Sequence, residues 1–299
     1  MSVLEYLGSG AFSYVVRVGD DEFLKVPKCA ALAPSLELEV AMLTKLQACT
    51  DGPGKKSIPV PLHNGKTRYN WCKTPQGEIS EIVGLHLKGL VGQTVDRLSR
   101  LDWEKHARTI ITQVFEALEF AHQNNVLHLD VKPGNIIVDI SSERARTMLS
   151  DWGCSMDNST LNSLHKFVGC TPYAHDDLLG NTGTWNVALK EELDFASLVY
   201  TVDHVHSGCL RWQYKFSEPT IVTSEGKKTR RELVKKWLCK EEGQPGSAGL
   251  PERIVQKFHE AIAVFTSERK RKKPNGWLNL LTQELAPLLT TSQGYANTM

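Results

Sequence analysis

The chain has 299 residues, of which 41% are hydrophobic and 23% are charged, and its formal net charge is +1. A chain of this length can bury a substantial core, and its balanced charge gives no overall attraction to nucleic acid or to a membrane surface. Its seven cysteines include no CxxC pair, which argues against a disulfide framework or a zinc site and favours a reducing compartment.

The first predicted element is a β-hairpin. Two β-rich segments, residues 14–18 and 22–26, are separated by a Gly-Asp-Asp turn. The hairpin would carry Lys25 on its second strand. Small residues precede it at Gly8 and Gly10, and by themselves these glycines predict only a turn.

A helix is predicted after Pro34, which is a favourable first helical residue. Its apolar residues recur at intervals of three and four, as expected for an amphipathic helix: Leu36, Val40, Leu43 and Leu46. Glu37 and Glu39 are two residues apart and therefore lie on different faces, so only one of them can point towards Lys25.

A second helical stripe predicts core packing further along the chain. Its members are Trp103, Ala107, Ile110, Val114, Leu118 and Ala121. Residues 136–138 and 148–150 predict two short strands that would support neighbouring polar residues. Residues 52–56 predict a surface loop because they are rich in glycine and lysine.

The most informative stretch directly precedes the first of these strands. It is His128-Leu129-Asp130-Val131-Lys132-Pro133-Gly134-Asn135, and Asp151-Trp152-Gly153 begins sixteen residues after its end. Transfer of a γ-phosphoryl group needs a carboxylate that positions the acceptor, a cation against the developing charge, and oxygen ligands for Mg²⁺. Asp130 would orient the acceptor hydroxyl and take its proton, and Lys132 would reach the γ-phosphate. Asn135 and Asp151 would bind Mg²⁺ through side-chain oxygens, which hard cations prefer.

These residues resemble the catalytic and metal-binding loops of the eukaryotic-type protein kinases, H-R-D-x-K-x-x-N and D-F-G. Two positions depart from the family pattern: Leu129 replaces an arginine, and Trp152 replaces a phenylalanine. Lys132 favours the Ser/Thr type of protein kinase. The resemblance therefore implies ATP- and Mg²⁺-dependent phosphorylation of Ser or Thr in protein substrates.

The same resemblance implies an α+β fold with two lobes. We expect a small β-rich N-lobe over residues 1–88, a larger helical C-lobe over residues 89–289 and a polar tail over residues 290–299. The implied nucleotide-binding residues of the Gly-rich loop are Leu7, Gly8, Ser9, Gly10, Ala11, Phe12, Ser13, Tyr14 and Val15.

Lys25 matches the ATP-anchoring lysine of the family and joins the nucleotide-binding set together with its glutamate partner. We prefer Glu39 as that partner, because the family's glutamate lies four residues before an apolar residue of the same helix, here Leu43. A solvated surface glutamate remains the alternative.

Later motifs resemble the substrate-docking part of the family. Gly169-Cys170-Thr171-Pro172-Tyr173 resembles the docking stretch that closes the activation segment. Asp194 resembles the aspartate that braces the catalytic loop, and Asp177 would replace a glutamate that pairs with an arginine, here Arg271. A leucine at 129 cannot bind a phosphate, so we predict activity without phosphorylation of the candidate segment residues, which are Ser155, Ser159, Thr160 and Ser163.

Two other functions compete. One is a small-molecule phosphotransferase of the aminoglycoside or choline kinase type, which shares the H-x-D-x-x-x-x-N loop and often has an Asp-Trp metal motif; Lys132 and the docking stretch argue against it. The other is a pseudokinase that acts as a binding module or scaffold. Such proteins usually lose the lysine, the base or a metal ligand, whereas here all are present: Lys25, Asp130, Asn135 and Asp151.

The remaining predictions concern partners and localisation. Residues 227–240 predict a basic helix, which is either a solvated face or a surface for an acidic partner. Residues 269–273 could serve as a nuclear import signal, although Arg271 has the structural role above. No apolar run approaches the ~20 residues that span a bilayer. We therefore expect a cytoplasmic protein, with a nuclear pool as an alternative, and neither membrane nor nucleic acid as a partner.

Overall fold

The computed structural model describes residues 5–10, 12–65, 67–69, 72–74, 77–79, 82–157, 169–174 and 191–208, together with 253, 254, 256 and 257. Several predictions lie outside these residues: the basic helix over 227–240, the pair of Asp177 and Arg271, and the tail over 290–299. Within the part that is described, no helix is both long and apolar enough to cross a bilayer.

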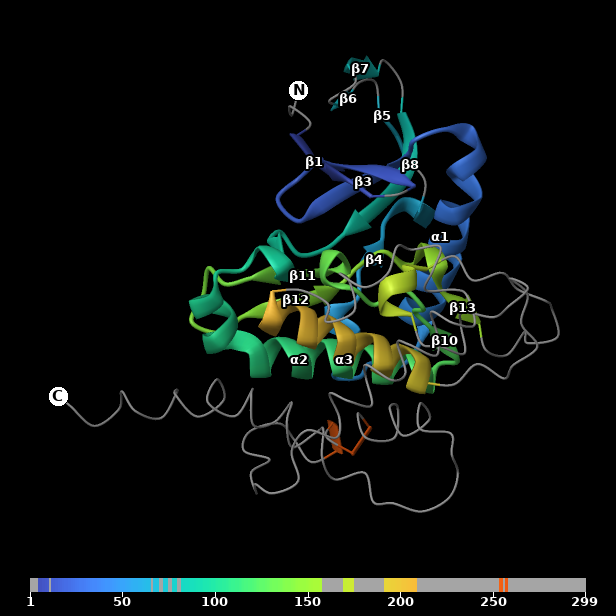
Figure 1. The fold of residues 1–299 in the computed structure, drawn as a ribbon. Helices are drawn as coiled ribbons and strands as arrows, with labels where there is room; N and C mark the ends of the chain where they lie inside the picture. Colours follow the sequence, from blue (N-terminus) through green and yellow to red (C-terminus); the bar gives the residue numbers. More distant parts are fainter. Residues whose placement is uncertain are drawn as a thin grey trace, which may run out of the picture.

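An antiparallel β-sheet forms the N-terminal lobe (Figure 1). Its strands are β1 (Glu5–Ser9), β2 (Ser13–Arg17), β3 (Glu22–Pro27), β8 (Ile82–Lys88) and β4 (Val60–Pro61) in spatial order, with β5 (Thr67–Tyr69) also paired to β8. A separate hairpin consists of β6 (Cys72–Thr74) and β7 (Gly77–Ile79). The predicted hairpin is confirmed, because β2 pairs with β3 and Val15 lies opposite Lys25.

One helix, α1 (Ala33–Ala48), packs on this sheet and follows the short 3-10 helix η1 (Ala30–Leu32). Its predicted apolar stripe is confirmed: Leu36, Leu43 and Leu46 are buried, and Val40 is partly buried against the same core. Glu39 is only 1% exposed, whereas Glu37 is exposed. Of the two carboxylates of this helix, only that of Glu39 therefore points towards the protein interior.

Two long helices of the second lobe lie within the described residues. They are α2 (Arg100–Gln123) and α3 (Glu192–Ser207), which pack together through stacked rings of Phe115 and Phe195 with centroids 4.8 Å apart. The hydroxyl of Ser99 caps α2 by accepting a hydrogen bond of 3.1 Å from the backbone N–H of Asp102. All six residues of the predicted stripe on α2 are buried, so the prediction of core packing is confirmed.

Short strands lie between α2 and the N-terminal sheet (Figure 1). They are β9 (Gln93–Thr94), β10 (Val126–Leu127), β11 (Ile136–Asp139), β12 (Arg146–Leu149) and β13 (Met156–Asp157). Both predicted short strands are present, as β11 and β12, and they pair with each other; β12 begins at Arg146, where this side chain pairs with Asp139 across the two strands. It ends before Ser150, whose N–H donates to the carbonyl of Asn135 at 2.8 Å.

The described residues also form several 3-10 helices: η2 (Lys55–Ser57), η3 (His63–Gly65), η4 (Val95–Arg97), η5 (Pro133–Asn135), η6 (Trp152–Cys154) and η8 (Thr171–Tyr173). The prediction of a surface loop over residues 52–56 is wrong in part. Gly54 is buried against α2, where an added Cβ would lie 1.9 Å from the carbonyl oxygen of Glu116. Glycine is needed there because no larger residue permits this close approach of two backbones.

Candidate functional site

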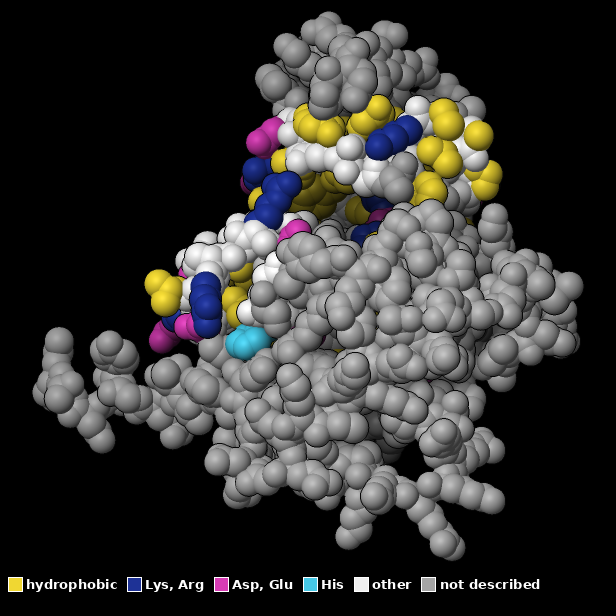
Figure 2. All heavy atoms as spheres, in the orientation of Figure 1, with side chains coloured by type: hydrophobic (Ala, Val, Ile, Leu, Met, Phe, Trp, Pro, Cys, Tyr) yellow, Lys and Arg dark blue, Asp and Glu magenta, His cyan; other side chains and the backbone are white. Residues whose placement is uncertain are grey.

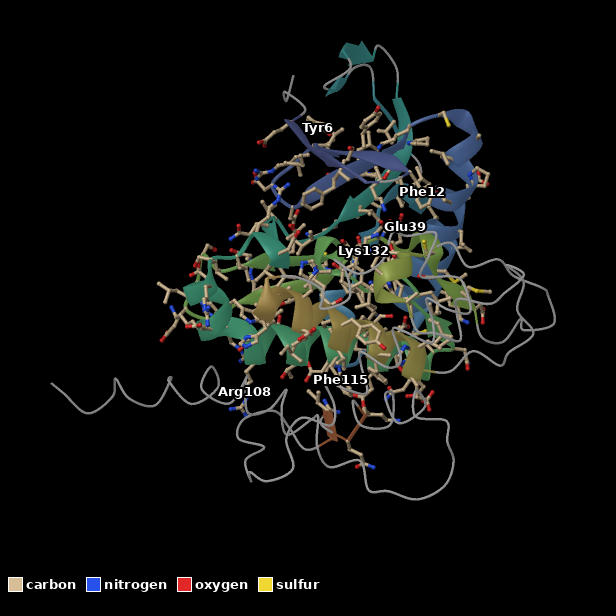
Figure 3. The ribbon with its side chains drawn as sticks, in the orientation of Figure 1. Tyr6, Phe12, Glu39, Arg108, Phe115 and Lys132 are labelled. Carbon is tan, nitrogen blue, oxygen red and sulfur yellow. The ribbon has the colours of Figure 1, made fainter. Side chains whose placement is uncertain are left out.

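The predicted site residues gather where the two lobes meet. Glu39 on α1 and Lys132, at the start of η5, lie on opposite sides of this junction (Figure 3). Hydrophobic side chains line the hollow beneath the N-terminal sheet, and a few charged side chains lie at its base (Figure 2). The site therefore combines an apolar surface beneath the N-terminal sheet with charged side chains on the opposite surface.

Lys25 links three elements at this junction. Its Nζ atom lies 2.6 Å from Oε2 of Glu39 on α1 and 2.8 Å from Oδ1 of Asp151, which directly follows β12 and Ser150. The predicted contact between Lys25 and Glu39, rather than Glu37, is present. The ion pair with Asp151 was not predicted, because nothing in the sequence relates β3 to a residue 126 positions away.

The charges of Lys25 and Asp151 support each other, whereas burial raises the pKa of the neighbouring Glu39 carboxyl. Burial opposes the charged form of Lys25, but the two carboxylates outweigh burial and raise the pKa of its ammonium group. Burial likewise opposes ionisation of Asp151, while the charge and hydrogen bond of Lys25 outweigh it and lower the pKa of that carboxyl. Lys25 and Asp151 therefore form a charged pair at neutral pH.

The segment after Asp151 is fixed by its tryptophan. Trp152 is fully buried, its ring lies edge-on to the ring of His128 with centroids 4.6 Å apart, and its indole N–H donates to the carbonyl of Leu149 at 2.9 Å. Its backbone N–H donates to Oε1 of Glu39 at 3.1 Å. Asp151 itself has a left-handed backbone with φ of 66°, which is strained for a residue with a Cβ.

Asp130 lies at the centre of the second cluster. Oδ2 of Asp130 accepts hydrogen bonds from Nζ of Lys132 at 2.6 Å and from Nδ2 of Asn135 at 3.0 Å. Its other oxygen, Oδ1, accepts a hydrogen bond of 2.6 Å from the backbone N–H of Cys170. Burial opposes the charge of Lys132, but Asp130 outweighs burial and raises the pKa of the lysine.

These contacts leave Oδ1 of Asp130 as the oxygen that can receive the proton of a substrate hydroxyl, because Oδ2 already accepts hydrogen bonds from two donors. A carboxylate oxygen has two lone pairs, so it can accept from a substrate hydroxyl and from Cys170 together. The contact with Cys170 was not predicted; the sequence indicated a docking stretch there but no contact with the carboxylate.

Asn135 and Asp151 fit the proposed Mg²⁺ site. The amide nitrogen of Asn135 donates to Asp130, so its side-chain oxygen remains available, and Oδ2 of Asp151 accepts no hydrogen bond within the described part of the chain. The two residues are brought together by the pairing of β11 with β12. Both available atoms are oxygens, which are the ligands Mg²⁺ prefers.

Asp194 braces the catalytic loop, as predicted. Its two carboxylate oxygens accept hydrogen bonds from the backbone N–H groups of His128 at 2.8 Å and Leu129 at 2.7 Å. A ring nitrogen of His122 lies 2.9 Å from Oδ2. Burial opposes ionisation of Asp194, but the hydrogen bond and charge of His122 outweigh it and lower the pKa of the carboxyl.

The predicted Gly-rich loop joins β1 to β2 above Lys25. The backbone N–H of Gly10 donates to the carbonyl of Ser13 at 2.9 Å, and an added Cβ at Gly8 or Gly10 would meet no atom within 4 Å. The space around these glycines is therefore open. Ala11 lies outside the described residues.

Comparison with known proteins agrees with this geometry. Residues 90–238 match the family model of the protein kinase domain. The chain belongs to the protein kinase family. Its α+β architecture, an N-terminal antiparallel sheet followed by helices, is the protein kinase fold.

Two curated relatives illustrate the similarity. Serine/threonine-protein kinase PknF of Mycobacterium tuberculosis is 36% identical over 121 residues, which are 39% of this chain and 24% of PknF. Serine/threonine-protein kinase dkf-2 of Caenorhabditis briggsae is 25% identical over 184 residues, which are 60% of this chain and 14% of that protein. The chain thus spans less than a quarter of the length of these relatives.

One residue of the chain, Ser155, differs from the sequence-based expectation, whereas Leu129 agrees with it. Ser155 is fully buried, so the prediction that it could be phosphorylated is wrong for this conformation. Leu129 is 4% exposed and has a left-handed backbone with φ of 61°, so it packs inside the catalytic loop. Burial raises the pKa of the Cys154 thiol to about 12, which makes this cysteine unreactive at neutral pH.

Proposed function

We propose that this kinase transfers the γ-phosphoryl group of ATP to Ser or Thr hydroxyls of protein substrates. The observation that carries the proposal is the pair of clusters at the junction of the lobes. In one, Lys25 lies between Glu39 and Asp151; in the other, Asp130 lies between Lys132 and the N–H of Cys170. The charge of Asp151 also acts on Lys132, so the two clusters belong to one site of the kind that phosphoryl transfer uses.

Each residue of the site has a distinct role in phosphoryl transfer. The acceptor hydroxyl gives its proton to Oδ1 of Asp130, and its oxygen bonds the γ-phosphorus as the bond to the β–γ bridging oxygen breaks. Lys132 stabilises the charge on the transferred group, and Lys25 holds the α- and β-phosphates. When bound at Asn135 and Asp151, Mg²⁺ would neutralise phosphate charge.

Two observations favour a protein kinase over the competing functions. Trp152 is fully buried, so the Asp-Trp pair that suggested a small-molecule phosphotransferase is used for packing against His128. Lys132, the residue that favours the Ser/Thr type, contacts the carboxylate of Asp130 directly. Both relatives above carry the name of serine/threonine-protein kinases, which supports the same class of acceptor.

The test is transfer of labelled phosphate from ATP in the presence of Mg²⁺ to a peptide array, a protein panel and a panel of small alcohols and aminoglycosides. Asp130→Asn should bind ATP almost normally and lose transfer, whereas Asp151→Asn should weaken Mg²⁺-dependent ATP binding itself. Lys132→Ala should lower kcat more than it weakens ATP binding.

Three results would contradict the proposal. Transfer at the wild-type rate by purified Asp130→Asn would remove that residue from the mechanism. Phosphorylation of a small alcohol, with none of any peptide or protein, would favour the small-molecule class. Binding of ATP without transfer to any acceptor would favour the pseudokinase.

A further inference from the structure

A cavity of about 880 Å³ lies apart from the catalytic clusters. Its walls are the chain between α1 and β4, the end of β8 and the adjoining residues, and the turn and strand from Ser142 to Met148. None of the proposed catalytic, nucleotide-binding or metal-binding residues lines it. The cavity is therefore a separate feature of the surface.

The described lining is strongly cationic. It contains five basic side chains and one carboxylate, Asp51; the basic residues are Lys55, Lys56, Lys88, Arg144 and Arg146. Three of them already have partners, because Lys55 pairs with Asp51, Lys88 with Asp21 and Arg146 with Asp139.

Lys56 and Arg144 are the two cations that remain available. Both are exposed, and neither forms an ion pair or hydrogen bond through its side chain within the described part of the chain. They lie on different walls, one on η2 and the other in the β11–β12 turn. An anionic ligand that spans the cavity would therefore meet a free cation on each side.

Part of the cavity lining is apolar. Its aliphatic lining consists of Ile58, Val60, Leu90, Ala145 and Met148. No aromatic side chain is among its described lining residues. Sites for single-stranded nucleic acid commonly stack bases on aromatic rings, so this lining favours a ligand with aliphatic groups.

The walls are held in place before any ligand arrives. Gly54 presses against the carbonyl of Glu116 on α2, where a Cβ would lie 1.9 Å from the oxygen. The side chain of Gln113 donates to the carbonyl of Ala145 at 3.0 Å. Because α2 contacts both walls, their separation is fixed, and a ligand need not order them.

A strand edge also lines the cavity. β12 is the outer strand of the sheet β12–β11–β9, and no other described strand pairs with its far edge. Three of its residues, Arg146, Thr147 and Met148, are part of the lining. An extended peptide can use backbone groups of such an edge, whereas a nucleic acid cannot extend a sheet.

We propose that this cavity docks an acidic peptide segment of a partner protein. Aliphatic side chains of the peptide pack against the aliphatic part of the lining, and its carboxylates lie against Lys56 and Arg144. The described lining includes none of residues 227–240, for which the sequence predicted an acidic partner. The binding does not depend on phosphoryl transfer, so it can be tested separately from the proposed catalytic function.

The test is selection of random peptides of about 12 residues, ~40 Å long when extended, on the intact chain, followed by fluorescence anisotropy of the selected peptides. We expect sequences in which Asp and Glu flank aliphatic residues. Lys56→Glu combined with Arg144→Glu should weaken their binding roughly tenfold or more, because two attractions become repulsions. The control combines Lys105→Glu with Arg108→Glu, two exposed cations of α2 outside the cavity.

The control carries the same change in net charge, so it should retain the wild-type affinity. Binding should also weaken as salt is added. Equal loss in both double variants would show an effect of net charge alone and would overturn the proposal. So would a failure to select acidic peptides, or binding of a single-stranded oligonucleotide that requires Lys56 and Arg144 when no peptide does.

Discussion

The backbone N–H of Trp152 donates a hydrogen bond of 3.1 Å to Oε1 of Glu39, although the two residues are 113 positions apart. The other oxygen of the same carboxylate holds Lys25. One buried side chain of α1 therefore positions both the lysine of β3 and the segment that follows Asp151. A displacement of α1 would therefore disrupt both contacts at once.

The first prediction follows from this double contact. Glu39→Gln keeps the size of the side chain and an oxygen for Trp152, but it removes the negative charge beside Lys25. We expect kcat/KM for ATP to fall roughly 100-fold, since a hydrogen bond to a charged group contributes about 2 to 3 kcal/mol. Steady-state kinetics at varied ATP concentration measure this.

Glu37→Gln is the matched control, because Glu37 lies on the same helix and is exposed. Its kcat/KM should stay within about twofold of the wild type. Equal losses in the two variants would mean that the charge of α1 matters and the specific contact with Lys25 does not.

The second prediction concerns Asp194, which accepts two backbone hydrogen bonds from the catalytic loop. Asp194→Asn would place an N–H₂ group against one of these backbone donors. We expect a loss of about 3 kcal/mol in the free energy of unfolding and a lower kcat, because the loop that carries Asp130 loses its support. Urea denaturation and transfer assays check the two effects.

Ser197→Ala provides the comparison within the same helix. The hydroxyl of Ser197 is buried but donates only to the carbonyl of Leu193 in its own helix. Its removal should lower the free energy of unfolding by less than about 1 kcal/mol and leave kcat unchanged. A similar loss of kcat in both variants would argue against a bracing role for Asp194.

The sequence predicted those parts of the fold and site that local patterns determine. The apolar stripe predicted α1. Because Glu37 and Glu39 are two residues apart, only one of them could point towards Lys25, and in the structure it is Glu39. The motif around Asp130 brought Lys132 and Asn135 together because these residues are neighbours in the chain. Asp194 was predicted from its resemblance to a known helix start.

Contacts between distant segments could not be predicted in this way. Two such contacts are the hydrogen bond from the N–H of Cys170 to Asp130 and the close approach of Gly54 to α2. Neither gives a periodic pattern in the sequence, because each depends on how whole elements pack. Ser155 was a candidate phosphorylation site because it lies in the activation segment, but its burial depends on the packing around η6. The cationic cavity likewise combines residues that are about 90 positions apart in the sequence.

The third prediction tests the packing of Gly54. Gly54→Ala would force a Cβ to within 1.9 Å of a backbone oxygen of Glu116, so one of the two backbones must move. We expect a loss of about 2 to 4 kcal/mol in the free energy of unfolding. Gly134→Ala is the control, since a Cβ there meets no atom within 4 Å, and its stability should change by less than about 1 kcal/mol. Equal stability of the two variants would contradict the close approach.

The fourth prediction concerns the loss of folding stability at acidic pH. Burial lowers the pKa of His128 from its ordinary value of 6.5, so below that pH the unfolded chain binds a proton more readily than the folded chain. Stability should therefore decrease as the pH falls below about 6.5. Burial also lowers the pKa of His106 and His204, which contribute in the same direction.

Thermal unfolding at about pH 7.5 and pH 5.5 measures this linkage. His128→Asn should have a lower Tm than the wild type at the higher pH, because packing against Trp152 is lost, but a smaller further decrease on acidification. An equal decrease in both proteins would assign the acid sensitivity to other groups.

The last prediction is that the kinase needs no phosphate on its activation segment. Leu129 is buried and cannot bind a phosphate, whereas an arginine at this place in the family can order the segment through a bidentate contact. The beginning of the segment is held by other means: β13 pairs with β10, and Nζ of Lys45 lies 2.7 Å from Oδ2 of Asp157. We therefore expect phosphatase treatment to change kcat/KM by less than about twofold.

Substitutions separate this explanation from phosphate-dependent ordering. Because Ser155 is buried, the variant to examine replaces Ser159, Thr160 and Ser163 with Ala, and it should be as active as the wild type. Lys45→Met should instead lower kcat/KM, since it removes the ion pair that ties α1 to β13. If phosphatase abolishes activity and rephosphorylation of these three residues restores it, another cation must take the place of the family's arginine, and Leu129 does not make the segment independent of phosphate.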